Sequence, residues 1–301
     1  MRTIACCLLV FGSPAWAQLS EAAKWAATAN YRVTPNLTYL TASNWEAKLD
    51  VYQPLGAGGA VPVLLYIHGG GWVSGSKEGA VMNLLPYMEL GWAVVNVGYR
   101  LARIAQAPAA VEDCLCALRW VYRNAKTYGF DTSRIVVTGH SAGGHLSLTT
   151  SLLPASAGLD RQCPGTEALK VAAVVNWYGI TDVNDLFEGA NQQTYAVQWL
   201  GSLPNREDIG RRVSPLSYVR GGLPPVLTVH GDADTVVPYA HAVRLHEALN
   251  KAGIANQLHT VPGGKHGGFS RDQTLKIFEI IHAFLGKHNL LRAAGPASDG
   301  R

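Results

Sequence analysis

The segment from Arg134 to Leu148, RIVVTGHSAGGHLSL, constrains the fold more than any other part of the sequence. It reads as an apolar strand, a turn with glycines on both sides of Ser141, and the start of a helix. A turn this sharp strains the backbone of the serine, and larger side chains at the glycine positions would collide with the strand and the helix. The segment therefore predicts a βα unit whose serine hydroxyl projects from the carboxyl end of a sheet.

Strand and helix patterns alternate along the rest of the chain. The stretch NLTYLTASNWEAKLDVYQP predicts a pair of antiparallel edge strands, and the apolar run VPVLLYIHG predicts a strand buried on both faces. Further strands and helices are expected in turn, the strands at 92–101, 134–141, 171–179, 224–231 and 256–262, and the helices at 78–90, 107–128, after Ser141, 239–252 and 273–288. Repeated βα units predict an α/β fold with a mostly parallel, doubly wound central sheet of about eight strands flanked by helices.

One connection is far longer than the others. About 40 residues separate the strand at 171–179 from the strand at 224–231, whereas connections in such folds usually have about 2 to 6 residues. We expect an inserted lid at about 183–219, because this stretch carries enough apolar surface to dock onto a pocket. A structural flap without substrate contact is the alternative. The apolar residues of the insert are Phe187, Tyr195, Trp199 and Leu200.

A serine in such a turn needs a base and an orienting acid to act as a nucleophile. In folds with this turn the order along the chain is serine, acid, histidine, each on a loop after a strand. The stretch HGDADTVVP offers Asp232 and Asp234, and we favour Asp234 because it lies further out, where the loop can swing back over the sheet. His266, in the glycine-rich loop of HTVPGGKHGGFS, is the expected base, since the rival histidines lie inside strands or on helices.

The stretch HGGGW, residues 68–72, follows the strand predicted at VPVLLYI. Acyl transfer passes through a tetrahedral oxyanion, which preorganised backbone N–H donors stabilise. Glycines let the backbone approach that oxygen closely. We therefore expect an oxyanion hole formed by the amides of Gly70 and Gly71, with Trp72 as a further donor and Ala142 completing the hole.

Together, HGGGW, GHSAGG, HGDADTVVP and the late His266 make the chain resemble the α/β-hydrolase superfamily over nearly all of residues 18–290. Within it, HGGGWVSGSKEG, VGYRL, GHSAGGHL, WYGITDV and SPLSYV look like the branch of bacterial feruloyl-esterase-like and acetyl-esterase-like carboxylesterases. The related hormone-sensitive-lipase-like branch usually has Asp before the nucleophile, where this chain has His140. The resemblance implies a catalytic domain at 18–290 that hydrolyses small acyl or aromatic esters, of the acetyl or feruloyl type, through an acyl-enzyme intermediate.

An amidase or formamidase is the alternative activity. Kynurenine formamidases are similar around GHSAG and would use the same three residues. They typically carry an aromatic residue inside the oxyanion-loop glycines, where this sequence has Gly71. They also act in the cytosol, which conflicts with the leader described below. A binding protein without activity would normally lack one of the three residues.

Aromatic residues near the predicted site could contact a substrate. Aromatic rings stack on aromatic or sugar groups, and export together with the resemblance favours a small ester or an esterified polysaccharide as the substrate. Core packing or loop anchoring explains each of these residues about as well. The residues concerned are Trp72, Trp177, Tyr178 and Trp199.

The N-terminus, MRTIACCLLVFGSPAWAQ, has the pattern of a cleavable signal peptide. Arg2 precedes an apolar run, and Ala15-Trp16-Ala17 fits the small-x-small site of a signal peptidase. The run is too short to span a bilayer, which takes about 20 residues. We expect a signal peptide at 1–17, cleavage after Ala17, export to a periplasm or the medium without a membrane span in the mature chain, and a flexible tail at 291–301.

Three cysteines remain after the leader. Cys114 and Cys116 lie two apart on a predicted helix and point in different directions, so they are not expected to bridge each other. Buried apolar packing is the simpler interpretation, and a bridge from Cys163 to either of them stays open.

Composition excludes several other classes of protein. Only 15% of the residues are charged, and the net charge of +4 comes from scattered lysines and arginines, so no nucleic-acid-binding face is predicted. The stretch after Gly70 nearly matches a phosphate loop, but Ser76 stands where the lysine belongs. No metal-ligand spacing is present, so neither a cofactor nor a metal is expected. The sequence does not indicate an oligomeric state.

Overall fold

The computed structural model describes residues 25–26 and 29–291. The predicted signal peptide at 1–17 lies outside the described residues, as do residues 292–301 of the tail expected at 291–301. The chain divides into two compact units, Met1–Asn30 and Tyr31–Arg301. The fold described below is that of the second unit.

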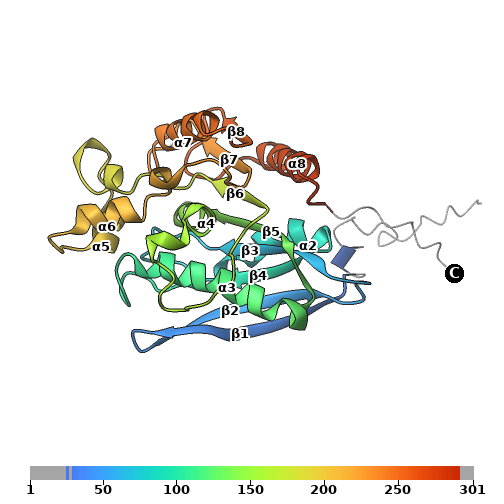
Figure 1. The fold of residues 1–301 in the computed structure, drawn as a ribbon. Coiled ribbons are helices and arrows are strands. Elements are labelled where there is room, and N and C mark those ends of the chain that lie inside the picture. Colours follow the sequence, from blue (N-terminus) through green and yellow to red (C-terminus); the bar gives the residue numbers. More distant parts are fainter. Residues whose placement is uncertain (1–24, 27–28, 292–301) are drawn as a thin grey trace, which may run out of the picture. The chain divides into compact units, whose positions relative to one another are not determined.

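The core of the second unit is one eight-stranded sheet (Figure 1) in the order β1-β2-β4-β3-β5-β6-β7-β8. β1 pairs with β2 and β2 with β4 in antiparallel fashion, and all the other pairs are parallel. The expected α/β fold with a mostly parallel sheet is therefore confirmed. The strands are β1 (Tyr31–Ala42), β2 (Trp45–Pro54), β3 (Val61–Ile67), β4 (Ala93–Val97), β5 (Phe130–His140), β6 (Ala173–Trp177), β7 (Val226–Gly231) and β8 (Asn256–Val261).

Helices cover both faces of this sheet (Figure 1). One face carries α3 (Ala109–Tyr128), α4 (Ala142–Leu152) and α7 (Ala240–Lys251), whose buried side chains join the main apolar clusters. The other face carries α2 (Leu85–Glu89) and α8 (Arg271–Lys287), which border a common pocket. The sheet is thus buried on both sides, which explains the continuous apolar runs of its central strands.

The central strand β3 shows how the sequence serves both faces. Val63, Leu65 and Ile67 are fully buried in the cluster that contains α3 and α4. Tyr66 points to the opposite face, where its hydroxyl accepts a hydrogen bond of 2.9 Å from Asn83. Successive side chains of a strand alternate between faces, so a strand covered on both sides needs apolar residues at every position.

The helix expected at 78–90 is split in the structure. Residues Glu78–Leu84 form a 3₁₀-helix, η1, and α2 begins at Leu85 with Pro86 in its first turn. Proline has no amide hydrogen to donate to the preceding turn, so an α-helix can start there but not run through it.

The long connection between β6 and β7 folds into several short helices. They are η3 (Asn184–Leu186), η4 (Gly189–Asn191), α5 (Thr194–Leu200), α6 (Arg206–Arg212) and η5 (Pro215–Tyr218). Phe187, Trp199 and Leu200 belong to the same apolar cluster as the sheet and α3, and each is at most 3% exposed. The insert at 183–219 is therefore anchored in the core of the domain.

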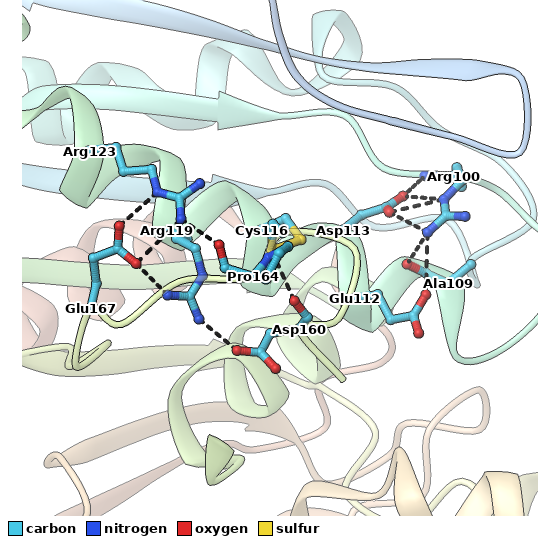
Figure 2. The surroundings of a disulfide bond; sticks show 11 residues. Arg100, Ala109, Glu112, Asp113, Cys116, Arg119, Arg123, Asp160, Pro164 and Glu167 are labelled. Carbon is cyan, nitrogen blue, oxygen red and sulfur yellow. Dashed lines mark hydrogen bonds and ion pairs between the residues drawn. A yellow bond between two sulfur atoms is a disulfide. The ribbon is translucent and has the colours of Figure 1, made fainter. Parts of the chain in front are cut away.

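The connection from α4 to β6, which includes η2 (Ala155–Ala157), is fastened to α3 (Figure 2). A disulfide joins Cys116 of α3 to Cys163, with the Cα atoms 5.6 Å apart. Beside it, Arg119 forms ion pairs of 2.6 Å with Asp160 and Glu167. Of the two bridges that the sequence left open, the structure thus has the one between Cys163 and Cys116, and Cys114 is buried with a free thiol.

No helix in the described part of the chain is both long and apolar enough to cross a bilayer.

Candidate active site

Ser141 lies at the turn between β5 and α4 with φ 57° and ψ −118°, a conformation that L residues rarely adopt. A Cβ atom added to either Gly139 or Gly143 would collide with the carbonyl oxygen of Ile67. The glycines around the serine are therefore required because β5 and α4 pass directly against the end of β3.

Three side chains from distant parts of the sequence form one hydrogen-bonded chain. Nε2 of His266 lies 2.8 Å from Oγ of Ser141, and Nδ1 of His266 lies 2.7 Å from Oδ2 of Asp234. With an ionised carboxylate, the ring carries its proton on Nδ1 and leaves Nε2 free to accept from the serine hydroxyl. This is the geometry of a nucleophile, a base and an orienting acid.

Asp234 is a buried carboxylate with a full set of donors. Its Oδ1 accepts hydrogen bonds from the amides of Val236 and Val237, at 2.8 and 3.0 Å. Burial by itself raises the pKa of Asp234, but the hydrogen bonds from His230, His266 and the Val237 amide outweigh it and hold the pKa well below its ordinary value. The side chain is therefore ionised at neutral pH, as an orienting acid must be.

The rival carboxylate, Asp232, is exposed and faces another loop. Its Oδ1 accepts a hydrogen bond of 2.6 Å from the amide of Gly263. It braces the loop that carries His266 and does not bond the ring.

His230 also contacts the carboxylate of Asp234, a role that the sequence did not indicate. The ring is fully buried, and its Nε2 lies 2.9 Å from the carbonyl oxygen of Val237 and 3.2 Å from Oδ2 of Asp234. Both neighbours are acceptors, so Nε2 carries the proton. Its position in the sequence was the available signal, because His230 is the next-to-last residue of β7, the strand that precedes the loop with Asp234.

The loop after β3 has an unusual backbone. Gly70, Gly71 and Trp72 all have positive φ values, 115°, 59° and 61°. A Cβ at Gly69 would lie 2.6 Å from the carbonyl oxygen of His140, so this loop runs directly against the turn that carries the serine. Within the described residues, the amides of Gly70, Gly71, Trp72 and Ala142 have no hydrogen-bond acceptor in the protein. Such free N–H groups suit a transient anion.

Trp72 and Trp199 lie inside the core, and this corrects their expected contact with substrate. Both indoles are 0% exposed and stack with ring centroids 4.1 Å apart. Nε1 of Trp72 donates a hydrogen bond of 3.1 Å to Nδ1 of His145, whose own Nε2–H donates to the carbonyl oxygen of Val213 at 2.7 Å. The two indoles join the loop after β3 to the insert and have no surface left to offer a ligand.

The other two aromatic candidates lie beside the hydrogen-bonded chain. Tyr178 is half-buried and meets the ring of His266 edge-on, with centroids 4.7 Å apart. Trp177 is 5% exposed and stacks on His140 at 4.8 Å. Tyr178 is therefore the aromatic side chain of the original four that is best placed to touch a substrate.

Tyr195 of the insert connects two loops of the site. A Cβ at Gly71 would lie 2.8 Å from Cβ of Tyr195, and the Tyr195 hydroxyl donates a hydrogen bond of 3.1 Å to the carbonyl oxygen of Val236 in the acid loop. An aromatic residue in place of Gly71 would not fit beneath this ring.

No group of three or more histidine, cysteine, aspartate or glutamate side chains among residues 25–26 and 29–291 is arranged to hold a metal ion.

A mostly parallel eight-stranded sheet with a strained serine turn after β5, an aspartate after β7 and a histidine after β8 defines the α/β-hydrolase class. The resemblance seen in the sequence is thus confirmed. The chain belongs to the BD-FAE family, whose profile matches residues 49–249.

Among curated proteins, the chain is 31% identical over 255 residues to esterase LipQ of Mycobacterium tuberculosis, covering 80% of this chain and 59% of LipQ. The chain spans about half the length of the curated relatives that it matches. Among solved structures, a truncated carbohydrate esterase from gut microbiota has a TM-score of 0.73 at 27% identity, covering 86% of this chain and 97% of that one. Esterase 2 of Thermogutta terrifontis with propionate bound has a TM-score of 0.72 at 26% identity, covering 89% and 97%.

Proposed function

We propose that this chain is a serine carboxylesterase that works through an acyl-enzyme intermediate. The observation that carries the proposal is the chain of hydrogen bonds from Ser141 to His266 to Asp234, at 2.8 and 2.7 Å. The names of its relatives support ester hydrolysis, since LipQ and the two structural neighbours described above are all esterases.

The reaction follows from the proton positions. Ser141 Oγ attacks the ester carbonyl carbon while Nε2 of His266 takes the hydroxyl proton. The carbon–oxygen bond to the alcohol then breaks, and the alcohol leaves with the proton from His266. A water molecule that gives its proton to the same nitrogen attacks the acyl-enzyme and releases the acid. Throughout, the Asp234 carboxylate stabilises the charged ring and holds its orientation.

The negative charge on the carbonyl oxygen needs donors during both halves of the reaction. We assign this role to the free amides of Gly70, Gly71 and Ala142, with Trp72 as a further donor. The Trp72 indole would act differently from its amide: buried against His145, it keeps the strained loop in shape. Preorganised donors are effective because they need not reorient when the charge forms.

Small acyl or aromatic esters, of the acetyl or feruloyl type, are the proposed substrates, free or carried on a polysaccharide. The propionate bound to T. terrifontis esterase 2 and the carbohydrate esterase among the neighbours support this range. The insert at 183–219 would act as a fixed wall over the site, because Trp199 and Leu200 are fully buried in the core.

The disulfide supports the proposal that the protein is exported after removal of residues 1–17. Structural disulfides persist in oxidising compartments and are rare in the cytosol, and Cys116 and Cys163 are bonded here. Mass spectrometry of the protein secreted by cells that express the full chain should find Gln18 at the N-terminus. A chain that keeps its leader and stays in the cytosol would contradict export.

The decisive experiment compares Ser141→Ala with the unchanged protein on nitrophenyl esters from acetate to decanoate, methyl ferulate and acetylated xylan. We expect the variant to fold normally and to lose nearly all turnover. A matched acetyl ester and formamide separate the esterase from the formamidase alternative, which would prefer the formamide. Normal ester turnover by a folded Ser141→Ala protein would refute the mechanism.

A further inference from the structure

A pocket of about 560 Å³ lies between the insert, the oxyanion loop and the segment that follows β4. Nothing in the proposed reaction uses it. Its lining combines two arginines with neutral residues and contains no carboxylate. The lining residues are Val73, Ala102, Arg103, Gln106, Val197, Gln198, Gly201, Ser202 and Arg206.

The two arginines carry charge that the protein does not neutralise. Within the described part of the chain, the side chains of Arg103 and Arg206 have no ion-pair or hydrogen-bond partner. The Arg206 guanidinium lies 4.7 Å above the ring of Phe187, which is 3% exposed. A cation held on an aromatic face keeps its position without losing its charge.

The carboxylates near the two arginines either pair with other cations or lie outside the lining of the pocket. Arg103 also borders a second pocket, where Glu46 is paired with Lys48 and Glu78 with Lys77. On α6, Asp208 pairs with Arg211, and Glu207, which directly follows Arg206, is exposed and does not line the pocket. The positive charge of Arg103 and Arg206 in this pocket is therefore available to bind an anionic ligand.

Backbone hydrogen bonds tie this pocket to the catalytic loops. The amide of Ala102 donates to the carbonyl oxygen of Trp72 at 2.9 Å, and the amide of Ala107 donates to that of Trp199 at 2.9 Å. Gln198 in the lining lies one helical turn from Tyr195, whose side chain covers Gly71. The pocket thus shares its walls with the loop after β3 and with the insert, the two segments that meet at Gly71.

We propose that this pocket is a subsite for a carboxylate carried by the substrate, so that acidic esterified glycans are preferred to neutral ones. This inference rests on the proposed esterase activity and adds a substrate class to it. Planar carboxylates match the guanidinium group, which binds them with paired hydrogen bonds.

The test uses acetylated xylo-oligosaccharides with and without a glucuronate branch. The unchanged protein should show a kcat/KM for the acidic substrate about three- to tenfold above that for the neutral one, in line with two partly exposed ion pairs. The difference should shrink in 0.5 M NaCl, because salt screens exposed charges. Arg103→Gln and Arg206→Gln should each lower the ratio of kcat/KM for the acidic substrate to kcat/KM for the neutral one. The double variant should bring this ratio close to one.

Two further variants serve as controls. Arg32→Gln removes the same charge from the exposed face of β1 and should leave the ratio unchanged. Arg206→Lys keeps the positive charge but loses the planar group and its stacking on Phe187, so it should retain only part of the preference, between that of the unchanged protein and that of Arg206→Gln. A ratio of one in the unchanged protein, or a ratio that survives the double variant, would overturn the subsite.

Binding can be measured apart from turnover. Calorimetry with Ser141→Ala and the deacetylated glucuronate oligosaccharide should show binding that the double arginine variant loses. If neither substrate is hydrolysed but this binding is present, the esterase proposal fails and the carboxylate site stands. If both substrates are hydrolysed equally and no binding is seen, the subsite alone fails.

Discussion

The indole Nε1–H of Trp72 donates a hydrogen bond of 3.1 Å to Nδ1 of His145, and both side chains are fully buried. This bond joins the loop that would hold the oxyanion to the helix that begins after Ser141. Since the opposite ring nitrogen donates to Val213, His145 has to be neutral with its proton on Nε2.

Two substitutions of His145 separate the two hydrogen bonds. His145→Asn places an acceptor near the Nδ1 position, whereas His145→Gln places its polar group near Nε2. If the bond to Trp72 shapes the oxyanion loop, Gln should lower kcat on an acetyl ester by about tenfold, the effect of an unsatisfied buried donor, and Asn by much less. Steady-state kinetics alongside melting temperatures give the answer, and equal kcat values for the two variants would argue against this role.

The stability of the fold should fall on acidification. Burial, only partly offset by the bond to Val213, lowers the pKa of His145 to about 4. The unfolded chain binds a proton at this residue below about pH 6.5, whereas the folded protein does so only near pH 4. The contribution of neutral His145 to the free energy of unfolding is therefore fully present above pH 6.5 and is lost as the pH falls towards 4. The loss from this group approaches about 3 kcal/mol over the interval.

Urea unfolding at pH 7, 6, 5 and 4.5 measures this dependence. His145→Asn cannot titrate and should show a shallower decline than the unchanged protein. Identical slopes would mean that other groups dominate the acid sensitivity.

His230 should position the acid through its hydrogen bond to Asp234. His230→Ala removes that donor, which raises the pKa of Asp234 towards its ordinary value and loosens the anchor of His266. We expect kcat/KM to fall by about tenfold, with the acid limb of its pH profile displaced upwards. His230→Gln can keep a donor near the Nε2 position and should restore most of the activity. A purely structural role predicts a lower melting temperature with an unchanged pH profile.

The disulfide should contribute to stability without affecting catalysis. It closes a loop with a sequence separation of 47 residues, for which chain entropy gives about 4 kcal/mol. Cys116→Ala should lower the free energy of unfolding by about this amount in non-reducing buffer, and the ester kinetics at 25 °C should be unchanged. Cys114→Ala, a change at the neighbouring free cysteine, is the control. It keeps the disulfide and should lose stability on reduction as the unchanged protein does, whereas the stability of Cys116→Ala should be insensitive to reductant.

Much of the site could be predicted because its signals are local or follow chain order. The serine turn needs a glycine on each side within a few residues, and the alternation of apolar and helical patterns identifies a parallel sheet. In a parallel sheet the strands all end at one edge, so the sequence alone predicts that the loops with Asp234 and His266 meet the serine.

The roles of Trp72, Trp199, His145 and His230 could not be predicted in this way. An aromatic residue beside a glycine loop has the same sequence pattern whether it faces a ligand or a buried partner. Which of the two holds depends on a helix more than 100 residues away, since Trp72 stacks on Trp199 of the insert. Periodicity within a segment carries no information about such a pairing.

The sequence by itself determined the fold class and the three residues of the hydrogen-bonded chain, because backbone sterics at the turn and strand order leave few alternatives. Only the tertiary structure decided that Cys163 bonds Cys116 rather than Cys114, that three of the four aromatic candidates are buried, and that Arg103 and Arg206 share a pocket without a carboxylate. These relationships depend on distances between segments that are far apart in the sequence, and they are set by how helices and loops pack on the finished sheet.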